Sequence, residues 1–152
     1  MKDERPSRLE DHLGYWLRCL SNLVSDSFAG RLEDRGVSVP QWVALRCLFD
    51  MEGAPLGDLA REVGVDNGAL SRMVERLVQK GLVSREAHPS DRRAVRLGLT
   101  DAGRKLVPVL AREADRNDAE FFCVIDADER ARLLATVKAL LEKNDWRGGA
   151  LE

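Results

Sequence analysis

The chain has few of the residues that build metal sites and disulfide frameworks. Its 152 residues include three cysteines, Cys19, Cys47 and Cys123, and two histidines, His12 and His88. The cysteines are odd in number and far apart, which fits neither paired disulfides nor a zinc motif. The sequence also lacks a nucleophile elbow, a phosphate-binding Walker loop and a metal-ligand motif. We therefore expect no enzyme, no metal and no cofactor.

Long apolar segments are missing as well. No apolar run reaches the roughly 18 residues that a membrane-spanning helix needs. The N-terminal segment MKDERPSRLEDH carries charges of both signs and has no apolar signal-peptide core. These absences predict a cytoplasmic chain without a membrane partner. A composition of 44% hydrophobic and 33% charged residues fits a folded protein, either one compact unit or a lobe with a helical arm.

The chain has little net charge, at −2, but its charges are segregated. Residues 66–105 hold nine lysines and arginines against five aspartates and glutamates, a net charge of +4. Residues 1–65 and 106–152 each have a net charge of −3. A basic segment between acidic ones suits local contact with phosphate without indiscriminate binding. Charge alone leaves open a chance clustering on a solvated face.

Apolar residues at helical spacing predict helices along most of the chain. Helices are expected over residues 8–34, from Ser38 to the break at 53–55, over 56–63, 66–80 and 101–122, and from residue 126 onward. Capping residues mark four of the starts: Ser38 with Gln41, Asp66, Thr100, and Asp126 with Glu129. The outer helices carry long apolar stripes, which include Leu133, Val137, Leu140 and Leu141.

Residues 56–81 follow the pattern of a helix-turn-helix, with Gly64 in the turn and Gly81 as the stop. The inner face of the second helix is expected to hold Leu70, Met73, Val74, Leu77 and Val78. Two short strands follow, over residues 82–86 and 93–99, joined by residues 88–92 as a turn longer than a tight two-residue loop. This order predicts a winged helix-turn-helix, a fold that is mainly α with a small β-hairpin wing.

The outer face of residues 66–80 has the side chains that a helix needs to read the major groove of double-stranded DNA. Asn67, Gly68 and Ser71 allow close approach near its N-terminal end, which points toward DNA in this motif. Arg72 and Arg76 can donate to guanine or clamp phosphate. An ordinary amphipathic helix with a solvated polar face explains the same residues about as well.

The tip of the hairpin is more specific. Arg92 and Arg93 can reach an adjacent minor groove, where negative potential attracts guanidinium groups. His88 either contacts phosphate or shapes the turn. The alternative is that Asp91 caps the turn and the arginines only solubilise it.

The whole order of features resembles the MarR family of bacterial transcriptional regulators. The wing matches that family's signature at seven positions: Pro89, Asp91, Arg93, Leu97, Leu99, Thr100 and Gly103. The resemblance implies that Arg93 is the inserted side chain and that Asp91 orients an arginine through an ion pair. It also implies a homodimer whose protomers interleave residues 1–36 and 101–152 as a dimerisation arm, with residues 37–100 as the DNA-binding domain.

Such a protein would bind a pseudo-palindromic operator with two recognition helices roughly 34 Å apart, most often as a repressor. One alternative is a monomer with an intramolecular helix bundle. Another is a winged-helix protein-interaction module without sequence-specific DNA binding, although the arginine-tipped wing argues against it.

Members of this family commonly respond to small aromatic or anionic molecules, so the resemblance also implies an effector. Tyr15, Trp16, Trp42 and Arg46 offer aromatic walls and one cation for such a ligand. Both tryptophans lie on apolar stripes, where core packing is the simpler explanation.

A cysteine-based redox switch is a less favoured alternative. The peroxide-sensing branch of the family has its reactive cysteine in the first helix, and the alignment places Gly14 at that position. Cys19 lies further along, and no basic cluster nearby favours a thiolate.

Overall fold

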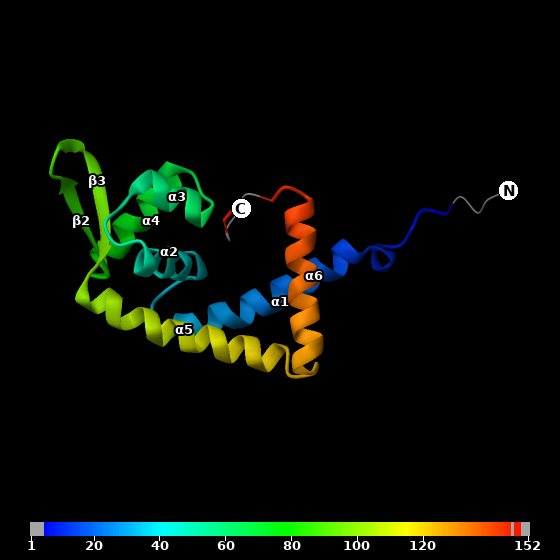
Figure 1. Cartoon of the computed structure of the whole chain (residues 1–152). Coiled ribbons are helices and arrows are strands. Elements are labelled where there is room, and N and C mark those ends of the chain that lie inside the picture. The colour runs from blue at the N-terminus through cyan, green and yellow to red at the C-terminus, as the bar shows by residue number, and fades with distance from the viewer. Residues whose placement is uncertain (1–4, 147, 150–152) are drawn as a thin grey trace.

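The computed structural model describes residues 5–146 and 148–149, with the side chains of Arg92 and Arg93 left out. A compact lobe holds the middle of the chain, and an arm of long helices extends from it (Figure 1). The arm contains the short 3₁₀ helix Leu9–Asp11, α1 (Leu13–Glu33), α5 (Asp101–Phe121) and α6 (Ala127–Lys143). The lobe contains α2 (Val39–Asp50), β1 (Ala54–Pro55), α3 (Leu56–Val63), α4 (Asn67–Gln79), β2 (Val83–His88) and β3 (Asp91–Leu99).

The helices begin where the capping residues predict. Ser38 and Gln41 form the expected reciprocal capping box, with backbone-to-side-chain distances of 3.2 and 3.3 Å. Asp66 accepts from the amide of Ala69 at 2.8 Å, and Asp126 accepts from that of Glu129 at 2.8 Å. Each bond satisfies an amide that the first helical turn leaves without a partner. Thr100 accepts from the amide of Gly103 at 3.1 Å, so all four predicted starts are confirmed.

The turn of the helix-turn-helix depends on a glycine. Gly64 follows the last residue of α3 with φ of 82°, in the left-handed region that other residues avoid. It reverses the chain within three residues, so that α4 can begin at Asn67.

The sheet differs from the sequence expectation in two ways. It has three strands in the order β1-β3-β2, because Ala54 pairs with Leu97 and Pro55 with Arg96. The predicted long turn over 88–92 is wrong, since β2 runs through His88, β3 begins at Asp91, and only Pro89 and Ser90 lie between them. A two-residue stretch such as β1 is too short to give a period-2 signal.

The hydrophobic core lies in the lobe. Its largest fully buried side chains come from α2, α3, α4 and β3 of the lobe, and also from α1 and α5: Leu32, Leu45, Leu48, Leu59, Val63, Leu70, Val74, Leu77, Leu97 and Leu110. Leu70, Val74 and Leu77 face inward as predicted, and Met73 is partly buried. Val78 does not, since it is 36% exposed at the outer end of the stripe.

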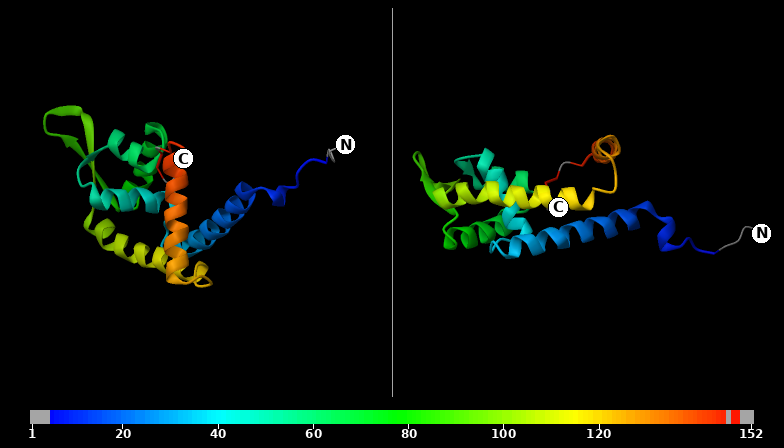
Figure 2. Two further views of the ribbon diagram at one scale, coloured as in Figure 1. Left: turned by 45° about the vertical axis from the view of Figure 1, so that its right-hand side comes forward. Right: turned by 90° about the horizontal axis from the view of Figure 1, so that it is seen from below.

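The arm, whose long helices extend from the lobe in both views of Figure 2, is not built around such a core. The predicted stripes are present, but the apolar side chains on them are largely exposed: Leu13, Trp16, Leu17, Leu20 and Leu23 on α1, and Leu133, Leu134, Val137, Leu140 and Leu141 on α6. No residue of α6, which is described over its full length, is buried. Within the described residues, no helix is both long and apolar enough to cross a membrane.

Candidate nucleic-acid interface

The helix α4 presents a polar face at the surface of the lobe. Asn67 and Gly68 form its exposed first turn, directly after the Asp66 cap. Arg72 and Arg76 follow on the exposed side, one and two turns further along. An added Cβ on Gly68 would lie 3.1 Å from a carboxylate oxygen of Asp66, so the bare glycine keeps this end narrow. Backbone amides and two guanidinium groups are thus available on one face.

Ser71 is tied to the wing by a residue that the sequence analysis did not single out. Arg85 of β2 donates from Nη2 to the Ser71 hydroxyl at 3.3 Å. Its cross-strand partner is the buried Leu97, which places Arg85 on the sheet face that packs toward α4. The sequence could indicate the role of Arg85 only through the pairing register of β2 with β3. An error of one residue in that register would place Arg85 on the opposite face of the sheet.

The tip of the wing carries a register shift. Ala87 pairs with Val95, whereas the next residue, His88, pairs with Asp91. Residues 92–94 of β3 therefore have no opposing partner on β2. Extra residues of this kind bend a strand and redirect side chains, and they are frequent beside functional sites. The candidates Arg92 and Arg93 lie in this stretch, but their side chains are outside the described part of the chain.

His88 is engaged with the turn itself. Its Nδ1 accepts from the backbone amide of Ser90 at 3.2 Å and lies 2.8 Å from the Ser90 hydroxyl. Nε2 lies 3.4 Å from Nη2 of Arg96. Of the two expectations for His88, these contacts favour shaping the turn.

The four candidate effector residues lie in two separate places, because Trp42 and Arg46 are one turn apart on α2 and the other two are on α1. Tyr15 and Trp16 form an edge-to-face pair at 5.3 Å near the start of α1. Trp42 packs on Phe28, with ring centroids 6.3 Å apart, against the lobe core. Arg46 donates to Asp50 at 2.6 Å and lies over the ring of Phe49. Tyr15 is about 20 Å from Phe28 along the helix axis, so a single chain does not gather the four into one cleft.

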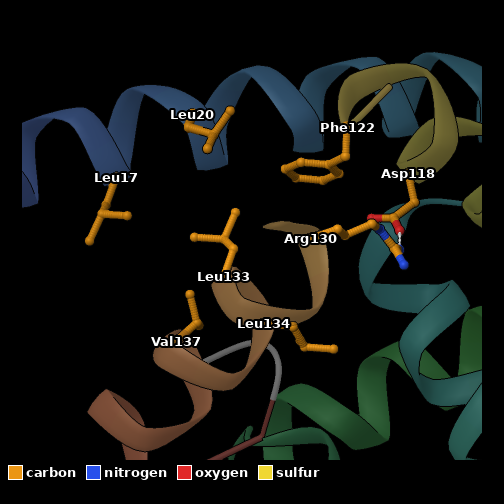
Figure 3. A pocket seen from close by; sticks show the side chains of 8 residues that line it. All are labelled: Leu17, Leu20, Asp118, Phe122, Arg130, Leu133, Leu134 and Val137. Atoms are coloured by element: carbon orange, nitrogen blue, oxygen red, sulfur yellow. Dashed lines mark hydrogen bonds and ion pairs between the residues drawn. The ribbon is translucent and has the colours of Figure 1, made fainter. Parts of the chain in front are cut away.

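An apolar cavity of about 230 Å³ lies in the arm between α1, α5 and α6. Figure 3 shows Leu17 and Leu20 of α1 facing Leu133, Leu134 and Val137 of α6, with Phe122 at one end. The ion pair between Asp118 and Arg130 closes that end. The cavity is continuous with the exposed apolar stripes of the arm.

The cysteines differ in exposure. Cys19 and Cys123 are exposed, and Cys47 on α2 is partly buried beside the core. Burial raises the pKa of the Cys47 thiol, helped by the nearby carboxylates of Glu62 and Asp50 and opposed by Arg46. Across residues 5–146 and 148–149, no three histidine, cysteine or carboxylate side chains gather in a way that could hold a metal ion.

The lobe matches a known family. Residues 37–95 match the model of the MarR family. The helix-turn-helix-type transcriptional regulator YdgJ of Bacillus subtilis, itself uncharacterized, is 33% identical over 109 residues, which cover 72% of this chain and 66% of that protein. The match therefore spans slightly less than two thirds of this relative's length.

Solved structures match both lobe and arm. A probable transcriptional regulator from Pseudomonas aeruginosa superposes with a TM-score of 0.79 and 29% identity, over 88% of this chain and 99% of that chain. MarR from Escherichia coli, as a cysteine-to-serine mutant complexed with operator DNA, superposes with a TM-score of 0.78 and 27% identity, over 85% of this chain and 93% of that chain.

A helix-turn-helix followed by a two-stranded wing, with β1 as the third strand, defines a winged-helix protein. The chain belongs to the MarR family. The relatives named above are transcriptional regulators by name.

Proposed function

We propose that this chain is a sequence-specific DNA-binding transcriptional regulator that acts as a repressor and binds a pseudo-palindromic operator as a homodimer. The observation that carries the proposal is the exposed face of α4, where Arg72 and Arg76 follow the open first turn at Asn67 and Gly68. This face lies within residues 66–105, which have a net charge of +4, whereas residues 1–65 and 106–152 each have a net charge of −3. The E. coli MarR structure complexed with operator DNA has the same fold.

In this proposal α4 enters the major groove with its N-terminal end first. Asn67, Gly68 and Ser71 approach the base edges, and Arg72 and Arg76 donate to guanine or to phosphate. Arg85 holds the Ser71 hydroxyl from the wing side and adds a positive charge between α4 and the hairpin. The backbone amides of the first turn favour phosphate.

The wing reaches the neighbouring minor groove. Arg93 is the proposed inserted side chain, Arg92 faces phosphate, and Asp91 orients an arginine. Support comes from the register shift that leaves residues 92–94 unopposed at the tip, and from the His88–Ser90 contacts that fix the turn beneath them.

The homodimer is proposed to form through the arm, with residues 1–36 and 101–152 as the dimerisation region and 37–100 as the DNA-binding domain. The exposed apolar stripes on α1 and α6 support it, because one chain leaves them facing water. A second copy would cover them and bring two α4 helices onto successive turns of one groove face.

The test compares operator affinity for four variants at about 150 mM salt, where non-specific contacts are weakened. Arg93→Ala is expected to weaken binding by ~1–3 kcal/mol, that is about 5- to 150-fold, and Arg72→Ala or Arg76→Ala also to relax the base preference. Arg112→Ala, an exposed arginine on α5, is the matched control and should leave affinity unchanged. Wild-type affinity for Arg93→Ala would contradict the wing assignment.

A small aromatic or anionic effector is proposed to release the DNA, with Tyr15, Trp16, Trp42 and Arg46 as candidate contacts. The separation of these residues within one chain means that a shared site would need both protomers. A panel of phenols and aromatic acids should shift the melting temperature of the wild type but not of Arg46→Ala. A panel that shifts neither the melting temperature nor DNA binding would contradict the proposal.

Two rival functions make different predictions. A protein-docking winged helix would bind DNA without regard to sequence and lose it at moderate salt. A redox switch would need a reactive cysteine, and Cys19 is the exposed candidate in the first helix. Unimpaired peroxide-induced release by Cys19→Ser would exclude Cys19 as the sensor.

A further inference from the structure

We propose that Asn117 and Ser27 form a polar lock that fixes the crossing angle of α1 and α5, the two arm helices whose ends are packed in the lobe core, and thereby the half-site spacing that the dimer accepts. The second part of this inference rests on the proposed function, whereas the first part concerns a single chain. The lock lies where α1 crosses the second half of α5 (Figure 2).

Asn117 is a buried polar residue at this crossing, with 4% of its surface exposed. Its amide nitrogen donates to the backbone carbonyl of Val24 at 3.2 Å. Its Oδ1 accepts from the Ser27 hydroxyl at 2.8 Å. Both bonds join α5 to α1, and no other α5 side chain bonds the α1 backbone among the described residues.

No apolar side chain in the arm half of this crossing is fully buried, among the residues that the structure describes. The other buried residues of α5 are Gly103, Val107 and Leu110, which lie in its first half beside the lobe. On α1 the buried residue is Leu32, at the lobe end. Toward the arm, Asn117 is therefore the one side chain that is fully enclosed between the two helices, as far as the structure describes them.

Hydrogen bonds are directional, so they fix a register that apolar contacts would leave free to slide. If α5 slid along α1 by about 1.5 Å, the rise of one residue, both hydrogen bonds of Asn117 would be stretched and misaligned while its amide stayed buried. A buried amide without partners is costly, which disfavours every other register. Beside Asn117 on α5, Glu113 also forms ion pairs with Arg31 at 3.8 Å and with Arg35 at 3.7 Å.

Small changes at the lock have large effects at the DNA-binding end. Asn117 is 17 residues from Thr100, the N-cap of α5 at the base of the wing, which corresponds to about 25 Å of helix. A change of about 10° in the crossing angle would displace that end by ~4 Å, more than the rise of roughly 3.4 Å per base pair. A variation of about 10° in the crossing angle of α1 and α5 would thus let the dimer accept half-sites whose separation differs by one base pair.

The first test measures the arm-to-lobe distance by spin labels within one chain. Labels are attached at Asn22→Cys on α1 and Glu62→Cys on α3, both exposed positions, with Cys19, Cys47 and Cys123 replaced by serine. Labelled chains are diluted into unlabelled ones, so that only intrachain distances count. We expect a narrow distribution for the wild type and one at least twice as broad for Asn117→Leu.

Companion variants separate the lock from general loss of stability. Ser27→Ala removes one bond and should broaden the distribution partly, whereas Ser27→Thr keeps the hydroxyl and should restore the wild-type width. Asp115→Asn, an exposed change on the same helix, is the matched control. Melting temperatures should not fall for Asn117→Leu, because an apolar side chain suits a buried position once the amide is gone.

The second test selects DNA fragments from a random library with each variant. The wild type should enrich one half-site spacing, and Asn117→Leu should enrich two or more. An unchanged distance distribution for a folded Asn117→Leu would overturn the lock itself. A broadened distribution with an unchanged, single half-site spacing would overturn the link to spacing. Failure of the wild type to enrich any sequence would count against the proposed function and leave the distance test to decide the lock.

Discussion

At the scale of single residues, Gly103 lies where α5 closely approaches Leu82, the residue before β2. A Cβ at this buried position would lie 2.1 Å from the backbone carbonyl oxygen of Leu82. The contacted atom belongs to the backbone and cannot rotate away as a side chain can. Gly103→Ala must therefore push α5 away from Leu82. We expect a loss of about 3 kcal/mol in the free energy of unfolding, measured by urea denaturation.

Gly30→Ala is the matched control for this prediction. Gly30 lies inside α1, and nothing is within 4 Å of the Cβ that alanine would add. Alanine in a helix interior should stabilise the protein by about 0.5–1 kcal/mol, since it has less freedom to lose on folding. Equal effects of the two substitutions would show that the close approach at Gly103 is not what constrains it.

A second prediction concerns thiol reactivity. Burial raises the pKa of the Cys47 thiol, so at neutral pH less of it is thiolate than in an exposed cysteine, and the thiolate is the reactive form. Cys47 should therefore alkylate more slowly than the exposed Cys19 and Cys123, and its rate should keep rising with pH beyond the ordinary thiol range. Mass spectrometry after timed iodoacetamide treatment measures all three. In urea the three rates should converge.

The residues that the sequence predicted well act locally. Ser38, Asp66 and Asp126 each bond an amide three residues away, so their roles follow from nearest neighbours along the chain. Arg85 and Asn117 could not be found in this way, because their partners lie 14 and 90 residues away. Their roles depend on strand register and helix crossing, which a single sequence does not reveal.

At the scale of elements, Thr100 joins three of them. Its hydroxyl donates to the carbonyl of Gly81 at 2.6 Å and accepts from the amide of Gly103 at 3.1 Å, which links the end of α4, the wing and the start of α5. Thr100→Ala should cost about 1–2 kcal/mol of unfolding free energy. Thr100→Ser should recover most of it.

Thr136→Ala serves as the comparison for Thr100. The Thr136 hydroxyl donates to the carbonyl of Arg132 within α6, on an exposed surface. Such a bond competes with water and contributes little. If Thr136→Ala lost as much stability as Thr100→Ala, the loss would come from removing any threonine hydroxyl bond in a helix, and not from the junction that Thr100 forms.

In the sheet, sequence patterns predicted one strand well but not the short strand or the turn. Alternation in Val95, Leu97 and Leu99 identified β3, because each second residue faces the lobe. The short strand β1 and the tight turn at Pro89 and Ser90 depend on pairing across the sheet. The ends of strands are set by the partner strand, and the irregular pairing at residues 92–94 has no signature in composition.

At the scale of the whole molecule, the exposed apolar stripe on α6 predicts that a second copy covers it. Leu133→Asp places a charge in the middle of this stripe, where burial against a partner would be costly. Sedimentation should show a dimer for the wild type and mostly monomer for the variant. Lys138→Asp, on the exposed polar side of α6, should leave the dimer intact.

The division into a DNA-binding domain over residues 37–100 and a dimerisation region over 1–36 and 101–152 stays a prediction, and it is compatible with a lobe that contains nearly all of the buried core. The grouping of Tyr15, Trp16, Trp42 and Arg46 could not be tested in the same way. Their placement in one chain separates them, and a site between protomers depends on contacts that neither sequence nor a single chain contains.

The central claim is that two copies of this chain read one DNA site with α4 and the wing. The most direct measurement selects fragments from a random duplex library at about 150 mM salt, then weighs the complex of protein with the enriched fragment. The account predicts an inverted repeat with half-sites about one helical turn apart, bound by two chains. Fragments without a common sequence, or one chain per enriched site, would contradict it.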